Sequence, residues 1–235
     1  MIPLYDDLPT RRFPWMTVAL IAANVLVFVY ELLLSGGAGV RLDLFFFRAG
    51  FVPYELTHLT DVPPVDLVPP PFTVFTSMFV HAGWLHIIGN MLFLWIFGNN
   101  VEDAMGKARF LAFYLLCGVA AAVAQTAIRP DSTIPNIGAS GAIAGVLGAY
   151  ILLYPRARVL TLVPVFIFFL PIIMLPAWVV IAAWFVLQLF EGLLSLGAAA
   201  GGGVAFFAHV GGFVAGLLLV SLFARRGPRP RGIVY

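Results

Sequence analysis

Apolar residues occur along this chain in six long runs, separated by segments rich in charge, proline or glycine. A membrane-spanning helix needs about 20 mostly apolar residues to cross the hydrocarbon core. It also satisfies its backbone hydrogen bonds internally, as a bilayer requires. We therefore predict an all-α membrane protein with six transmembrane helices, over 15–34, 75–97, 110–128, 138–154, 176–196 and 203–223.

The segment 35–71, between the first two runs, is long for a connection. It contains four acidic residues and a cluster of prolines, but also the apolar stretch 44–47. This mixture is too apolar for a solvated linker. We expect a long outer loop with short pieces lying in the membrane interface. A disordered, proline-rich segment is the alternative.

A second ambiguous region, 159–175, is apolar enough to be taken for a seventh span. Pro164 and Pro171 argue against a regular helix there. A seventh span would also put the C-terminal arginines outside, against the positive-inside bias. We interpret this region as a hook on the cytoplasmic side.

The basic residues give the six-helix arrangement an orientation. With the N-terminus inside, ten of the 13 Lys and Arg residues fall on the cytoplasmic side: Arg11, Arg12, Lys107, Arg109, Arg156, Arg158, Arg225, Arg226, Arg229 and Arg231. Three fall outside: Arg41, Arg48 and Arg129. We therefore expect both termini to be cytoplasmic, in a prokaryotic cell membrane.

Composition narrows the class of protein. Of the 235 residues, 62% are hydrophobic and 10% charged, and the mean hydropathy of +1.02 excludes an ordinary soluble domain. The spans use nearly the whole length, so we expect a single membrane domain over 1–235, in contact with membrane lipids. The net charge of +2 is too small to suggest nucleic acid. With one cysteine, Cys117, and no zinc-binding motif, we predict no metal and no other cofactor.

Ser140 is the most distinctive polar residue, because it stands among glycines where the fourth run begins. Small residues such as Gly138 and Gly141 are a common means of packing membrane helices closely, and packing alone would explain the stretch. A hydroxyl here would also lie beside main-chain N–H groups without intrahelical partners. The alternative is therefore a nucleophile with half of an oxyanion site.

His209, in the sixth run, is a candidate base for such a nucleophile. Spans two, four and six enter from the same outer face, so residues near their starts share one depth. His209 lies about 8 to 10 Å along a helix that begins near Gly203. Gly212 and Gly216 share its helical face and allow close contact with the helix of Ser140. No acidic residue is at hand for a triad, so we expect a Ser-His dyad; the alternative is a histidine that only hydrogen-bonds between helices.

His86 and Asn90 lie four residues apart in the second run and so share one helical face. Both could donate to a developing oxyanion, or they could form an interhelical hydrogen-bond pair. His81 is five residues from His86, so the two should diverge around the helix, which disfavours a paired metal site. We interpret Gln188 and Glu191, in the fifth run, as anchors of a loop or gate rather than catalytic groups.

Three motifs in order resemble the rhomboid family of intramembrane serine proteases. They are the segments 81–90 (HAGWLHIIGN), 138–141 (GASG) and 208–212 (AHVGG), and 97–103 (FGNNVED) is also similar. The resemblance covers about 72–223. Each motif alone is weak, but the combination in this order is highly specific.

The resemblance implies a rhomboid-like bundle in which Ser140 is the nucleophile and His209 the base. His86, Asn90 and the main-chain N–H at Ser140 would form the oxyanion site. It implies a serine endopeptidase that cleaves transmembrane protein substrates near the membrane surface. Some relatives place an aromatic ring against the catalytic histidine one turn after the serine, where this chain has Ala144. Something else must therefore hold the ring of His209.

Two functions other than proteolysis are alternatives. A non-catalytic relative that binds membrane helices would be marked by loss of the serine or histidine, and both are present. A small transporter would need midplane charges and broken helices, for which the runs give little support. The sequence predicts neither the substrate nor the oligomeric state.

Overall fold

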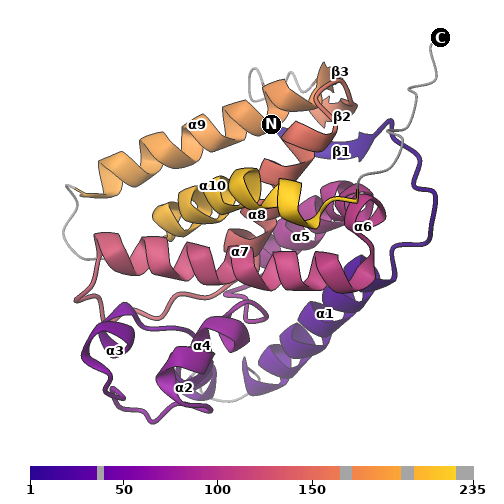
Figure 1. Ribbon diagram of the computed structural model, residues 1–235. Coiled ribbons are helices and arrows are strands. Elements are labelled where there is room, and N and C mark those ends of the chain that lie inside the picture. Colours follow the sequence, from indigo (N-terminus) through magenta and orange to yellow (C-terminus); the bar gives the residue numbers. More distant parts are fainter. Residues whose placement is uncertain (36–39, 165–170, 197–203, 226–235) are drawn as a thin grey trace.

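The computed structural model describes residues 1–35, 40–164, 171–196 and 204–225, and it is mostly helical (Figure 1). Its helices are α1 (Trp15–Ser35), α2 (Val40–Ala49), α3 (Pro53–His58), α4 (Pro70–Ser77), α5 (Trp84–Phe93), α6 (Asn99–Met105), α7 (Lys107–Ile128), α8 (Ser140–Leu153), α9 (Ala177–Leu196) and α10 (Phe206–Phe223). A π-helical segment, Leu94–Gly98, joins α5 to α6. The strands are β1 (Ile2–Asp6), β2 (Arg158–Leu162) and β3 (Ile172–Pro176).

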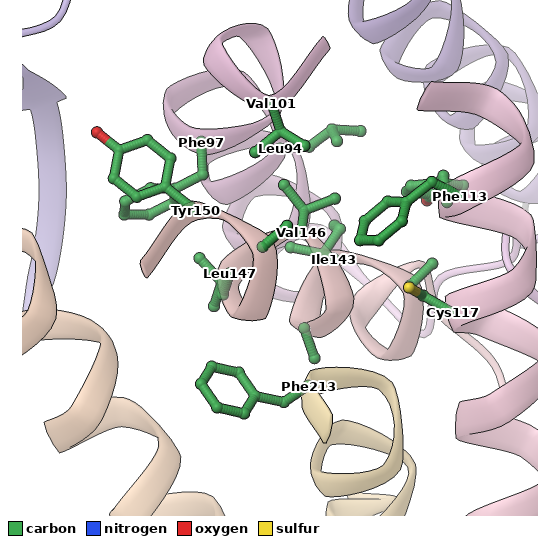
Figure 2. Packing of buried hydrophobic residues seen from close by; sticks show 14 of the residues in the cluster. Leu94, Phe97, Val101, Phe113, Cys117, Ile143, Val146, Leu147, Tyr150 and Phe213 are labelled. Carbon is green, nitrogen blue, oxygen red and sulfur yellow. The ribbon is translucent and has the colours of Figure 1, made fainter. Parts of the chain in front are cut away.

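Helix α8 lies in the middle of the bundle, and residues 141–150 are all buried. Figure 2 shows its apolar side chains among residues from three neighbours: Cys117 of α7, Phe213 of α10 and Phe97 of the π-helical segment. A helix surrounded in this way must let its neighbours approach closely, which small residues permit. The glycines and alanines of the fourth apolar run therefore have a packing role.

The approach of α10 to α8 depends on glycines that face the backbone of the other helix. A Cβ added at Gly212 would overlap the carbonyl oxygen of Gly141, and one at Gly216 would overlap that of Gly145. The small faces predicted for these two helices do meet. Their contact brings the first turn of α8 against the first turn of α10.

Four helices, α1, α7, α9 and α10, are long and apolar enough to cross a membrane. Their outward positions include leucines such as Leu33 and Leu222, which are 75% and 73% exposed within the chain. Exposed apolar surface on this scale suits lipid rather than water. The chain is an integral membrane protein. The predicted count of six spans also requires the 14-residue α8 and the stretch that begins with α5, and it stays a prediction.

The second predicted span differs most from the structure. Helix α4 ends at Ser77, and the next helix starts only at Trp84, then continues as helix to Met105, through the segment predicted to be a linker. His81 precedes this helix, so its spacing from His86 has no helical meaning. The prediction that the two diverge is wrong: their ring centroids lie 5.0 Å apart.

The two ambiguous segments have regular structure. The described part of 35–71 contains α2, α3 and the start of α4, which agrees with a loop of short folded pieces rather than a disordered one. The hook forms β2 and β3, paired antiparallel, and β1 adds to the other edge of β2. The all-α prediction is wrong in this detail, because β3 (IIMLP) is a continuous apolar run, which periodicity alone cannot distinguish from helix. Residues 165–170 lie outside the described part.

Strand β1 is tied to the bundle through the buried carboxylate of Asp6. Asn100 Nδ2 and the Tyr150 hydroxyl each donate to its Oδ2 at 2.7 Å. Burial raises the pKa of Asp6 to about 6; the Tyr150 hydrogen bond opposes this shift, and the charge of Asp7 adds to it. This network joins the N-terminus to the region where α6 and α8 meet.

The end of the bundle that holds the sheet also holds many charged groups. Glu102 accepts the N–H groups of Met16 (3.0 Å) and Thr17 (2.7 Å), and so caps the start of α1. Three basic residues predicted to be cytoplasmic line one cavity here: Arg12, Lys107 and Arg225. Gly203 and the last three arginines of the sequence lie outside the described residues.

Candidate active site

Ser140 and His209 meet at the contact between α8 and α10. Ser140 is the first residue of α8, and His209 lies in the first turn of α10. The distance between Ser140 Oγ and His209 Nε2 is 2.7 Å, within hydrogen-bonding range. Because α10 begins at Phe206 rather than near Gly203, His209 is about 4.5 Å along its helix, not the predicted 8 to 10 Å.

The second ring nitrogen of His209 is held by Gln188, from α9. Nδ1 lies 2.5 Å from Gln188 Oε1, and both side chains are buried. An amide oxygen can only accept, so Nδ1 carries the proton in this arrangement. Nε2 is then the unprotonated nitrogen, and it accepts a hydrogen bond from the Ser140 hydroxyl. This is the tautomer that a general base requires.

Gln188 is the site residue that the sequence prediction misplaced. Its side chain contacts His209 instead of anchoring a loop. The ring of Trp184, one turn earlier on α9, also lies near that of His209, with centroids 5.8 Å apart. These two residues hold the imidazole in a chain that has Ala144 where some relatives have an aromatic ring. Within the described residues the carboxylate of Glu191 makes no hydrogen bond.

His86 lies near the start of α5, and its ring is close to Gly138, two residues before Ser140. The Ala82 N–H donates to its Nδ1 at 3.3 Å, which leaves the proton on Nε2. Gly138 separates this nitrogen from the serine: a Cβ there would lie 2.7 Å from His86 Nε2 and 3.6 Å from Ser140 Oγ. Gly138 also has a φ of +122°, which favours glycine. Gly138 therefore leaves space between a donor and the candidate nucleophile.

Asn90 lies one turn after His86 on α5, as the spacing predicted. It is 7% exposed, and its Nδ2 has no hydrogen-bond partner among the described residues. A buried amide without an acceptor costs free energy, and such groups often mark functional sites. The N-terminal turn of α8 adds further donors. The Ile143 N–H donates to Ala139 O at 3.0 Å. The N–H groups that precede Ile143 in this turn therefore have no acceptor within the helix.

A small cavity adjoins Ser140 between α4, α7 and α8. Its α7 wall consists of Gly118, Ala121 and Ala122, and Ala142 and Ala208 contribute further small side chains. The cavity has room beside the serine for little more than a small side chain. Both Gly138 and Gly141 also line it.

Glu31 is a buried acidic residue that the sequence prediction did not consider. It is 2% exposed, near the end of α1, and its Oε1 accepts the His81 N–H at 3.0 Å. A carboxylate inside an apolar run was the available signal, since such groups are rare in spans. Its contact holds the segment before α5, and so supports the position of His86.

Comparison with known proteins relates this geometry to a family. A family model described as a Rhomboid domain matches residues 70–226. RHOMBOID-like protein 1 of Arabidopsis thaliana is 26% identical over 233 residues, covering 91% of this chain and 54% of that protein. Rhomboid protease AarA of Providencia stuartii is 27% identical over 151 residues, covering 58% and 50%. Rhomboid protease GluP of Bacillus subtilis is 41% identical over 76 residues, covering 32% and 14%.

The chain spans about half the length of these relatives, or less. The segment matched by the family model nevertheless includes all the helices from α4 to α10. It also includes Ser140, His209, His86 and Asn90. Because the matched segment is more than half of the sequence, this chain belongs to the rhomboid family.

Proposed function

We propose that this chain is an intramembrane serine endopeptidase that cleaves transmembrane protein substrates. The observation that supports this most directly is the 2.7 Å contact between Ser140 Oγ and His209 Nε2. A serine hydroxyl that donates to an unprotonated imidazole nitrogen is the arrangement needed to activate the nucleophile.

In the proposed reaction His209 Nε2 takes the proton of Ser140 as Oγ attacks the carbonyl carbon of the scissile peptide. The tetrahedral intermediate collapses when the imidazolium returns this proton to the leaving nitrogen. The product is an ester on Ser140 and a free amine. A water molecule, deprotonated by His209, then attacks the ester and regenerates the serine.

The negative oxygen of each tetrahedral intermediate needs donors. His86 Nε2–H, the Asn90 amide and the main-chain N–H of Ser140 supply them in this proposal. The unpartnered state of Asn90 Nδ2 supports its role, because this buried donor has no acceptor among the described residues. No donor has to be released when the charge develops.

Gln188 acts as a positioning residue in this mechanism. By accepting the Nδ1–H hydrogen bond it maintains the His209 tautomer whose Nε2 can receive the serine proton. It takes the place that an aspartate has in a triad, but it brings no negative charge. A neutral acceptor costs less to bury in a membrane protein than a carboxylate does.

Substrate selection follows from two features. The small volume of the cavity beside Ser140 favours a small residue at the cleavage position. A substrate helix must also expose its carbonyl to Ser140, so glycine or proline near the site should favour cleavage.

Helices α8 and α10 run from the site toward the basic end of the bundle. We propose that this end is cytoplasmic, with both termini, and that cleavage occurs near the outer surface.

The proposal can be tested with proteoliposomes that contain the protein and a model transmembrane substrate. The wild type should cleave a span with glycines near its outer end faster than a poly-leucine span of matched length and flanks. Ser140→Ala and His209→Ala should remain folded and inactive. Cleavage by Ser140→Ala at the wild-type rate would exclude the dyad. Binding of the substrate helix without cleavage by the wild type would favour a non-catalytic rhomboid-like protein, the main alternative.

A further inference from the structure

Helix α3 and the segment between α3 and α4 bring three carboxylates together, on the same end of the bundle as Ser140. Glu55, Asp61 and Asp66 each direct a carboxylate oxygen to one place, and these oxygens all lie within 4.8 Å of one another. Glu55 is only 1% exposed and Asp66 9%, whereas Asp61 is exposed. Three like charges at this separation repel one another strongly unless a cation or a proton intervenes.

The buried oxygens in this cluster lack partners. Within the described residues, Glu55 Oε2 and both carboxylate oxygens of Asp66 have no hydrogen-bond donor. The donors nearby are already assigned to other atoms: Val62 N–H donates to Glu55 Oε1 at 2.9 Å, and Asp66 N–H donates to Asp61 at 3.3 Å. The guanidinium of Arg48 donates through Nε to Val65 O; its charge attracts the Asp66 carboxylate but it makes no hydrogen bond with it. The unpartnered oxygens therefore point to a ligand that offers positive charge.

We propose that Glu55, Asp61 and Asp66 bind a divalent cation, and that this cation is Ca²⁺. Carboxylate oxygens are hard ligands, which both Ca²⁺ and Mg²⁺ prefer. Calcium–oxygen distances of about 2.3–2.6 Å allow ligands up to about 5 Å apart across the ion, which accommodates the observed spread. Magnesium requires a near-ideal octahedron at about 2.0–2.1 Å, which suits three carboxylates of one irregular segment less well. Water would complete the coordination.

The cation would stabilise one wall of the candidate active site. Helix α3 is bonded to the segment that leads to Ser140: Tyr54 N–H donates to Ser132 O, and Thr57 Oγ1 donates to Pro130 O, both at 3.0 Å. Just before α3, Phe51 pairs with Asn136 as an isolated β-bridge. A cation that joins α3 to the chain before α4 would therefore fix the position of this wall.

Thermal unfolding of the purified, EGTA-treated protein tests this site. With an affinity of about 10⁻⁴ M, 1 mM Ca²⁺ should raise the Tm of the wild type by about 3 to 6 °C, and Mg²⁺ should raise it less. Asp66→Asn and Glu55→Gln should lose this response. Asp43→Asn, an exposed acidic residue in the same loop but outside the cluster, is the matched control and should keep it. If one variant fails to fold, calorimetric titration of the wild type with Ca²⁺ measures binding without that variant.

Three results would overturn the proposal. If the wild type neither binds Ca²⁺ by calorimetry nor changes Tm, the carboxylates of Glu55 and Asp66 share a proton instead. If all variants respond to Ca²⁺ as the wild type does, the ion acts elsewhere. A further expected result is that metal-free Asp66→Asn is at least as stable as the metal-free wild type, because the substitution removes repulsion. A clear loss of stability in that variant would indicate a structural hydrogen bond and contradict a cation site.

Discussion

Gln188 gives the sharpest test of how the candidate dyad is organised. Gln188→Met keeps the length and the unbranched shape of the side chain, but its thioether sulfur is at most a weak acceptor. The Nδ1–H of His209 would then be buried without a partner, since the residue is only 8% exposed. Leaving a buried donor unsatisfied costs about 1 to 3 kcal/mol.

Loss of this hydrogen bond raises the free energy of the His209 tautomer and ring orientation that place Nε2 toward Ser140. A smaller fraction of the enzyme molecules should then hold His209 in that arrangement. Each 1.4 kcal/mol is about tenfold in rate, which predicts a fall in kcat of about 10-fold to 100-fold. KM should change little, because Gln188 does not line the cavity beside the serine. The measurement is steady-state cleavage of a transmembrane substrate in proteoliposomes, together with Tm.

A second variant separates positioning from packing. Gln188→Glu keeps an acceptor and adds negative charge, which favours the imidazolium form of His209. The acidic limb of the pH–rate profile should therefore move to higher pH, a change that a packing role would not produce. Glu191→Gln, one turn away on α9, is the control and should behave as the wild type. The reasoning is refuted if Gln188→Met keeps full kcat, or if the pH profile of Gln188→Glu is unchanged.

Three other predictions follow from the structure. Asn90→Ala should lower kcat by on the order of 10-fold to 1,000-fold, with KM and Tm nearly unchanged, because it removes one oxyanion donor; unfolding in mild detergent would instead identify a packing residue. Gly212→Val should lower Tm and abolish activity, because the new side chain would force α10 from α8. Gly89→Ala, where a Cβ meets nothing within 4 Å, should be neutral, and equal stability of the two variants would contradict the packing account. The raised pKa of Asp6, about 6, means that the folded protein holds this proton more tightly than the unfolded chain. This contribution to stability should therefore decline as pH rises from about 4 to 6, and Asp6→Asn should flatten the dependence of Tm on pH in that window; an identical slope in both proteins would show that Asp6 does not titrate there.

Hydropathy was enough to locate the long helices, because a bilayer imposes length and apolar character on each span. The boundaries of α7 and α9 agree with the predicted runs within three residues. The second run misled because hydropathy does not register a break between two short helices. His81 and Trp84 are three residues apart in the same predicted run, although one precedes the helix and the other begins it.

The meeting of Ser140 with His209 could be predicted because both stand near the start of a span and both are followed by small residues. Those two features determine depth and close approach, which suffice for one contact. Gln188 could not be placed in this way. Its contact depends on the rotation of α9 relative to α10, and no spacing within one helix encodes that rotation.

The outer segment shows a similar limit. Glu55, Asp61 and Asp66 are five and six residues apart and belong to no periodic element, so the sequence alone gave no reason to group them. They converge because α3 and the chain after it fold back, with Leu67 N–H bonded to Arg48 O at 2.9 Å. Such tertiary contacts are set by the loop as a whole.

The central proposal, that Ser140 is a nucleophile activated by His209, is tested most directly by covalent labelling. The detergent-purified protein should react with a fluorophosphonate probe, and mass spectrometry should find one adduct, on Ser140. Ser140→Ala should not be labelled, and His209→Ala should be labelled far more slowly while its Tm stays close to that of the wild type. Labelling of Ser140→Ala equal to that of the wild type, or no labelling of a folded wild-type protein, would contradict the proposed protease.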